Sequence, residues 1–206
     1  GVVTSLGVGK TENWRRLTSG ESGIHPITRF PIDHLNTTIA GTIDFLESSG
    51  TPDLTFELAE TAAAEALAQA GLGGSDFGGR LFLASPPVEL GWNDRLRLNG
   101  RSDADSGYKR LLAIAAAAEN GEIFESIMFG TIADRLSDRF GTRGLPVTLS
   151  TACASGSTAI QLGAESIRRR EADRALSIGA DGSATEEALI RFSLLSALST
   201  QNDAPT

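Results

Sequence analysis

The sequence of 206 residues has very few cysteine and histidine side chains, the residues that hold transition metals and, for cysteine, form disulfides. It contains one cysteine and two histidines. One cysteine cannot form a disulfide within the chain, and no spacing of cysteine and histidine is typical of a metal site. A lone thiol suits a reducing compartment, so we expect a cytoplasmic protein that needs no cofactor and no metal.

Long hydrophobic runs and an excess of basic residues are also lacking. The longest apolar run covers residues 111–118, far below the roughly 18 residues that suggest a membrane span. No signal-peptide pattern is found. The 26 acidic residues outnumber the 18 basic ones, giving a net charge of −8. Because the longest apolar run is short, we expect no membrane span. Because an acidic chain is poorly suited to binding a phosphate backbone, we expect no nucleic-acid partner.

Short apolar runs alternate with alanine-rich helical patterns along the chain, which predicts an α/β layer architecture. Apolar runs bounded by turn residues predict strands over residues 80–85, 145–151 and 174–179. Capping residues and helical spacing predict helices over residues 51–70, 108–119, 122–140, 154–170 and 185–198. Residues 85–99 hold prolines and a glycine and are expected to form a loop. The chain opens without methionine and closes in a turn-like stretch, so we expect it to be part of a longer protein.

The only cysteine, Cys153, lies in LSTACASGST (residues 149–158), between a predicted strand and a predicted helix. Unpaired N–H groups and the dipole at a helix N-terminus favour an anion, so we expect a stabilised thiolate and a good nucleophile. The small residues Ala152, Ala154 and Gly156 leave room for a substrate carbonyl, and N–H groups of the turn could stabilise an oxyanion. The alternative is a buried cysteine that acts as a small hydrophobe.

Three segments carry a resemblance to a known family. STACASGSTAIQLGAESIRRREADRALSIGAD (residues 150–181) resembles the nucleophile segment of the β-ketoacyl-acyl-carrier-protein synthases, which are thiolase-fold condensing enzymes. TSLGVGKTENWRRLTSGESGI (residues 4–24) resembles the segment after the family's first strand. LSTQNDAPT (residues 198–206) resembles the end of its amino-terminal half.

The resemblance implies that residues 1–206 form the amino-terminal ketosynthase domain, without the carboxy-terminal half. The implied fold is α/β and thiolase-like, a mixed β-sheet with helices on both faces. It would pack against a second, similar half and form a homodimer. The implied reaction is the decarboxylative condensation of an acyl thioester with malonyl carrier protein, without a cofactor, which makes acyl carrier protein the expected partner.

The resemblance also implies roles for individual residues. Cys153 would receive the acyl chain as a thioester, and its own N–H would be one oxyanion donor. Phe192 matches an aromatic residue of the acyl pocket, with ordinary core packing as the alternative. Met128, with Ile127 and Phe129, could line the acyl channel or a dimer surface, although helix packing is the simpler interpretation.

The histidines depart from the family's pattern. Its two catalytic histidines lie in motifs of the carboxy-terminal half, and His25 and His34 match neither; we expect both to be solvated loop residues. Other hypotheses therefore stay open: a thiolase-type acyltransferase that uses coenzyme A, a noncatalytic interaction fragment, and a cysteine hydrolase that uses His25 or His34. GVGKT (residues 7–11) resembles a phosphate-binding loop, but Thr4 stands where that pattern needs glycine.

Overall fold

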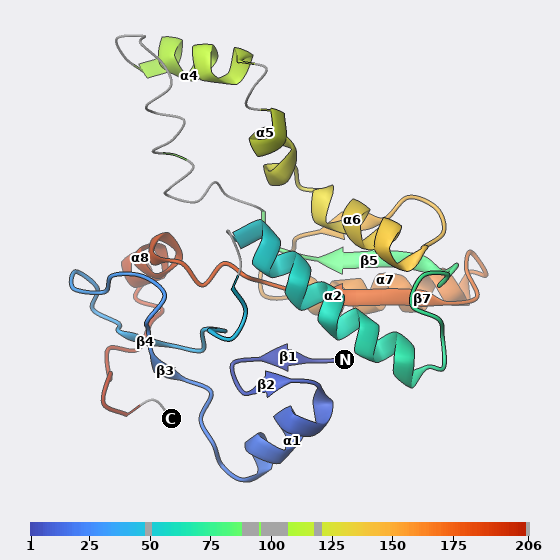
Figure 1. The fold of residues 1–206 in the computed structure, drawn as a ribbon, viewed down its shortest axis with the longest axis horizontal. Helices are drawn as coiled ribbons and strands as arrows, with labels where there is room; N and C mark the ends of the chain where they lie inside the picture. The colour runs from blue at the N-terminus through green and yellow to red at the C-terminus, as the bar shows by residue number, and fades with distance from the viewer. Residues whose placement is uncertain (48–50, 88–94, 96–106, 118–120, 205–206) are drawn as a thin grey trace.

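The computed structural model describes residues 1–47, 51–87, 95, 107–117 and 121–204. Its main sheet has three strands, β5 (Arg80–Ala84), β6 (Val147–Leu149) and β7 (Ala175–Gly179), in the order β6-β5-β7 (Figure 1). All three run parallel. Their carboxyl ends therefore lie at one edge of the sheet, where ligands of open α/β sheets usually bind.

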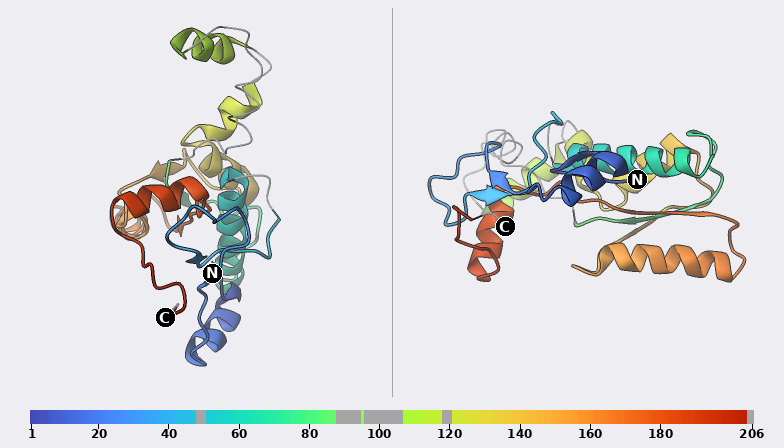
Figure 2. Two further views of the ribbon diagram at one scale, coloured as in Figure 1. Left: turned by 90° about the vertical axis from the view of Figure 1, so that its left-hand side faces the viewer. Right: turned by 90° about the horizontal axis from the view of Figure 1, so that it is seen from below.

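Helices cover both faces of this sheet, as parallel strands require. Helices α2 (Thr51–Gln69) and α6 (Thr131–Phe140) lie on one face, and α7 (Ser155–Arg168) lies on the other (Figure 2). The central strand β5 packs against the helices on both faces, because successive side chains of a strand point to opposite faces.

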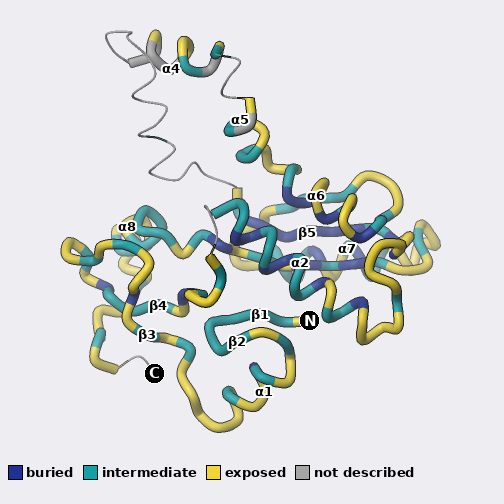
Figure 3. The backbone as a smooth tube through the Cα atoms, viewed as in Figure 1, coloured by how far each residue is buried: buried dark blue, intermediate teal, exposed yellow. Residues whose placement is uncertain are grey.

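The buried core is divided accordingly into two clusters. Leu81 and Leu83 of β5 pack with α2 and α6, whereas Phe82 and Ala84 pack with Ala159 of α7. Figure 3 shows that the buried residues gather in these layers, while the remaining segments are mostly half-buried or exposed.

The other elements surround the sheet. A first ribbon pairs β1 (Val3–Thr4) with β2 (Gly7–Val8), and a second pairs β3 (His25–Pro26) with β4 (Ile39–Ala40), both antiparallel. Helix α1 (Lys10–Thr18) follows the first ribbon, and α8 (Glu186–Leu194) follows β7. Helices α4 (Gly107–Ala116) and α5 (Gly121–Ile127) extend away from the sheet (Figure 1).

Segments far apart in the sequence are tied together beside the second ribbon. The Thr37 hydroxyl donates to the Ser199 carbonyl at 2.7 Å. The Asn202 side chain accepts from the Thr38 N–H at 2.9 Å and donates to the Asn36 carbonyl at 3.1 Å. The segment after α8 therefore holds residues 36–38 in place.

The expected α/β architecture, with helices on both faces of a sheet, is confirmed, and so are the three predicted strands. Most helices are also confirmed, but the single helix predicted over residues 122–140 is wrong. It is two helices, because Thr131 ends α5 by donating from its N–H to the Met128 carbonyl and from its hydroxyl to the Glu125 carbonyl. The last helix ends earlier than predicted, and Ser196 beyond it has a left-handed φ of 53°.

Helix α1 is not among the helices predicted from the sequence. The predicted loop over residues 85–99 falls mostly outside the described residues. Within the described ranges, no helix has both the length and the apolar character needed to cross a membrane.

Candidate active site

The segment around Cys153 forms a sharp turn between a strand and a helix, as the sequence predicts. Strand β6 ends at Leu149 and helix α7 begins at Ser155. Ala152 occupies the left-handed region with φ 51°, a conformation that costs free energy in any residue with a Cβ. Cys153 is exposed to solvent, so it is not buried within this chain.

A single hydroxyl group bridges the two sides of this turn. The Ser155 Oγ accepts from the Thr151 N–H at 2.8 Å and donates to the Ala152 carbonyl at 2.6 Å. The Ser155 N–H donates to the same Ala152 carbonyl at 3.1 Å. The Ala152 carbonyl therefore has two donors, both from Ser155.

The second side chain that supports the turn is Thr158. Its hydroxyl lies 3.0 Å from the Thr151 hydroxyl and donates to the Ala154 carbonyl at 3.0 Å. Within the described part of the chain, none of these side-chain bonds uses the N–H of Cys153 as its donor. The turn thus presents a thiol and a backbone N–H on the same residue, the pair of groups that acyl transfer needs.

Close packing of α7 on the sheet fixes where this turn lies. Gly163 of α7 is buried against β7, and a Cβ there would overlap the Ser177 hydroxyl. That hydroxyl donates to the Ala159 carbonyl one turn earlier at 2.9 Å. The helix can approach the strand this closely only because residue 163 has no side chain.

The two residues predicted to bind substrate lie on separate elements. Phe192 lies on α8 and is 52% exposed, and Met128 follows α5 and is 49% exposed. Both exposures exclude ordinary core packing within this chain. Helix α8 follows β7 at the carboxyl edge of the sheet, the same edge at which β6 leads to Cys153. The roles of Phe192 and Met128 in an acyl pocket stay predictions.

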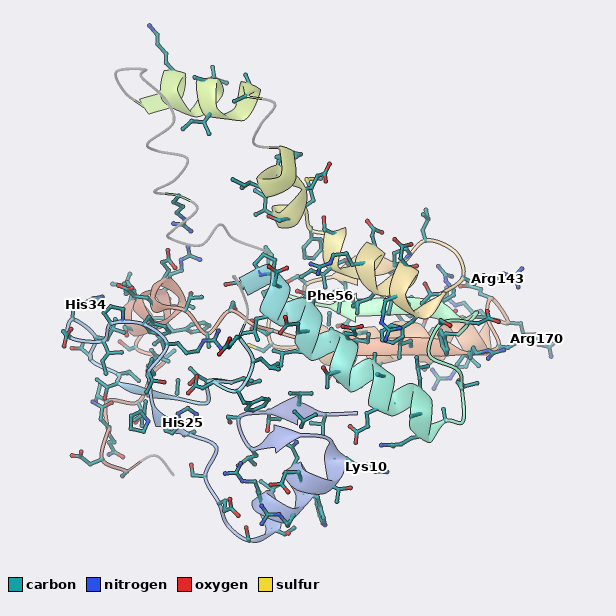
Figure 4. All side chains as sticks on the ribbon, in the orientation of Figure 1. Lys10, His25, His34, Phe56, Arg143 and Arg170 are labelled. Atoms are coloured by element: carbon teal, nitrogen blue, oxygen red, sulfur yellow. The ribbon has the colours of Figure 1, made fainter. Side chains whose placement is uncertain are left out.

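His34 is exposed in a turn, as expected, whereas His25 lies in strand β3 and is half-buried. The two ring nitrogens of His25 lie 3.1 Å from the Pro26 and Thr42 carbonyl oxygens. His34 Nε2 lies 2.7 Å from a Glu186 carboxylate oxygen at the start of α8. Figure 4 shows both rings on the segment between α1 and α2. These contacts engage both rings in holding that segment.

The stretch that resembles a phosphate-binding loop already has an internal anion. Gly9 precedes α1, and the Glu65 carboxylate of α2 accepts from the Lys10 N–H at 2.8 Å and from the Val2 N–H at 2.9 Å. These two hydrogen bonds, first that from Lys10, hold the pKa of Glu65 below its usual value. A carboxylate thus occupies the position that a phosphate would take at this helix N-terminus.

A search for metal ligands gives no candidate. The described residues contain no group of three or more histidine, cysteine, aspartate or glutamate side chains placed to hold an ion.

Ser155 is a residue of the site that was not predicted from the sequence. Its signal is a serine at the first position of α7, two residues after Cys153, since such residues commonly bond to nearby backbone.

Comparison with known proteins relates the whole chain to one family. Residues 1–205 match the family described as "Beta-ketoacyl synthase, N-terminal domain". A 3-oxoacyl-[acyl-carrier-protein] synthase 2 from Coxiella burnetii is 26% identical, with all of this chain and 50% of the relative covered. The protein of the same name from Vibrio cholerae is 28% identical, with 99% of this chain and 51% of the relative covered. The chain spans about half the length of these relatives.

Solved structures give the same result for the fold. A β-ketoacyl synthase from Burkholderia phymatum has a TM-score of 0.71 at 25% identity, covering 98% of this chain and 50% of its own. A type II polyketide ketosynthase in complex with its acyl carrier protein has a TM-score of 0.74 at 24% identity. It covers 98% of this chain and 48% of its own. The thiolase-like fold expected from the sequence is therefore confirmed for this half.

Proposed function

Because the chain belongs to the β-ketoacyl synthase family, matching its amino-terminal domain, we propose that it supplies the acyl-accepting half of a β-ketoacyl-acyl-carrier-protein synthase. The observation that carries this proposal is the turn at Cys153, which places an exposed thiol between the end of strand β6 and the start of helix α7. The turn lies at the carboxyl edge of the sheet.

In the first step the Cys153 thiolate attacks the carbonyl carbon of an acyl thioester. The carbonyl oxygen takes up the negative charge and accepts a hydrogen bond from the Cys153 N–H. The tetrahedral intermediate then collapses, the bond to the carrier's sulfur breaks, and the released thiolate takes a proton. The acyl group is left on Cys153 as a thioester.

In the second step malonyl carrier protein loses carbon dioxide, and the resulting enolate carbon attacks the acyl-Cys153 carbonyl. A carbon–carbon bond forms, the bond to Cys153 breaks, and the product is two carbons longer. The groups that assist decarboxylation belong to the part of the relatives that this chain does not cover. Phe192 and Met128 line the acyl pocket in this proposal, and acyl carrier protein brings both substrates.

The outer face of α7 supports packing against a second, similar half. Ala159 and Gly163 face the sheet, whereas Ile160 is 65% exposed and Ile167 is 45% exposed on the same helix. Exposed apolar side chains on a central helix favour a covering layer. The proposed assembly is a homodimer of the complete enzyme, and the lone thiol supports a cytoplasmic location.

The decisive test is acyl loading of this chain. The wild-type protein and the variants Cys153→Ala and Ser157→Ala are incubated with an acyl carrier protein thioester, and the adduct is located by mass spectrometry of peptides. Ser157 is the matched control, since it is exposed, lies in the first turn of α7 and makes no described side-chain hydrogen bond. We expect an acyl adduct on Cys153 in the wild type and in Ser157→Ala.

The outcomes separate the open hypotheses. Absence of any adduct on Cys153 in the wild type would contradict the proposal and leave the noncatalytic fragment. Loading from an acyl coenzyme A thioester but not from the carrier protein would favour the thiolase-type acyltransferase.

A further inference from the structure

The Ser155 hydroxyl occupies an unusual place for a residue at the start of a helix. It does not cap an N–H of α7, and Ala154, at the N-cap position, makes no side-chain cap hydrogen bond either. It turns back instead, and both of its hydrogen bonds go to the chain before Cys153, one to the Thr151 N–H and one to the Ala152 carbonyl. The hydroxyl therefore organises the turn rather than the helix.

The bond to the Ala152 carbonyl has a direct consequence for Cys153. A trans peptide is planar, so its carbonyl and its N–H point in opposite directions. The Ala152 carbonyl and the Cys153 N–H belong to the same peptide. Because the Ser155 hydroxyl and N–H both hold that carbonyl on the helix side, the Cys153 N–H is directed away from α7.

We infer that Ser155 is a positioning residue that aims the Cys153 N–H at the carbonyl oxygen of the acyl thioester. The inference rests on the proposed acyl transfer to Cys153 and adds a specific role to a side chain that does not touch the substrate. The group that touches the substrate is the backbone N–H, and Ser155 acts through the peptide that carries it.

The local backbone explains why this peptide needs a second donor. Ala152 has a φ of 51°, which an alanine adopts only when its surroundings impose it. Rotation of the Ala152–Cys153 peptide, about ψ of Ala152 and φ of Cys153, would turn the N–H away from the substrate. The Ser155 hydroxyl opposes the rotation at both ends, since it binds the Ala152 carbonyl and anchors the Thr151 N–H before it.

The two reactions of a cysteine respond differently to this N–H. Attack on a thioester places negative charge on an oxygen, and the loss of one oxyanion donor typically slows such a step by roughly 10²–10³-fold. Alkylation by iodoacetamide proceeds by displacement of iodide at a saturated carbon and builds no oxyanion. A misdirected N–H should therefore slow acyl transfer and leave alkylation nearly unchanged.

The experiment compares the wild type with Ser155→Ala, Ser155→Thr and Ser157→Ala. For each, the rate of acyl transfer from a carrier protein thioester to Cys153 and the rate of Cys153 alkylation are measured. We expect Ser155→Ala to lower the acyl-transfer rate roughly ten- to a hundredfold and the alkylation rate by less than about twofold. Ser155→Thr keeps the hydroxyl and should recover most of the acyl-transfer rate, and Ser157→Ala should match the wild type.

The outcomes separate this inference from the proposed function. If the wild type loads no acyl group, the proposed function fails. If the wild type loads and Ser155→Ala loads at the same rate, the positioning role is refuted. Equal losses of both rates in Ser155→Ala would also refute it, because they would indicate damage to the turn as a whole. Far-ultraviolet circular dichroism establishes that the variant has kept its helices.

Discussion

Replacing Gly163 with alanine tests whether the close approach of α7 to the sheet is a structural requirement. In an exposed helix the change would stabilise the chain by about 1 kcal/mol, because alanine is the better helix former. Here the added methyl group overlaps the Ser177 hydroxyl. Its other two neighbours, Ala175 Cβ at 3.4 Å and Phe82 Cδ2 at 3.7 Å, are at ordinary contact distances.

The magnitude follows from three contributions. Overpacking in a well-packed core costs typically about 1–3 kcal/mol. Displacement of the Ser177 hydroxyl also breaks its hydrogen bond to the Ala159 carbonyl, which contributes about 1 kcal/mol. The gain in helix propensity offsets about 1 kcal/mol. We therefore expect Gly163→Ala to lower the free energy of unfolding by about 1–3 kcal/mol, measured by urea denaturation and circular dichroism.

A double-mutant cycle measures how much of the cost of Gly163→Ala comes from the contact with Ser177. Ser177→Ala removes the overlapping oxygen and should cost about 1 kcal/mol on its own. In that background the methyl at position 163 meets only ordinary contacts, so Gly163→Ala should be neutral or stabilising there. If Gly163→Ala stabilises the otherwise unchanged chain, or costs the same in both backgrounds, the close approach at Ser177 is not what requires glycine.

Two further contacts give predictions of their own. Glu65→Gln should lower the free energy of unfolding by about 1–2 kcal/mol at neutral pH. Because the pKa of Glu65 is lowered in the folded state, its contribution is complete above the unfolded pKa and is lost as the pH falls through the folded one, so denaturation of both proteins in acid should converge. Asn202→Ala removes the acceptor of the Thr38 N–H, and amide exchange at Thr38 should accelerate about tenfold without change at Leu83.

Much of the fold could be predicted because the main layers are built from regular patterns. The strands β5, β6 and β7 are short apolar runs, and α2 and α7 carry small or apolar residues at helical spacing. Burial of these side chains is the main driving force for the layers, so periodicity alone locates them.

Helix α1 could not be predicted in this way. Its one buried residue is Asn13, while Trp14 and Leu17 are exposed. The Asn13 amide donates to the Gly7 carbonyl at 2.9 Å and to the Gly9 carbonyl at 2.8 Å. A helix held through a polar side chain has no buried apolar stripe, so hydrophobic periodicity does not predict it.

The candidate site, like the fold, could be predicted only in part. The exposure of Cys153 follows from its small neighbours and its place between a strand and a helix, both of which can be read from the sequence. The role of Ser155 depends on the left-handed backbone at Ala152. The residue types of the segment do not predict that conformation, since alanine rarely adopts it.

Gly163 and Ser155 contribute to different properties of the protein: Gly163 to its stability, and Ser155 to the direction of the Cys153 N–H. Gly163 lies eight residues along α7 from Ser155, about 12 Å at 1.5 Å per residue, so a methyl there displaces the helix. The bonds of Ser155 and Thr158 lie within the turn and the first turn of α7, and they move with the helix as one unit. Gly163→Ala should therefore change stability while the ratio of acyl transfer to alkylation stays constant. Ser155→Ala should change that ratio with little effect on stability. Variants at the two positions that moved both quantities together would indicate that the turn and the helix are not separable.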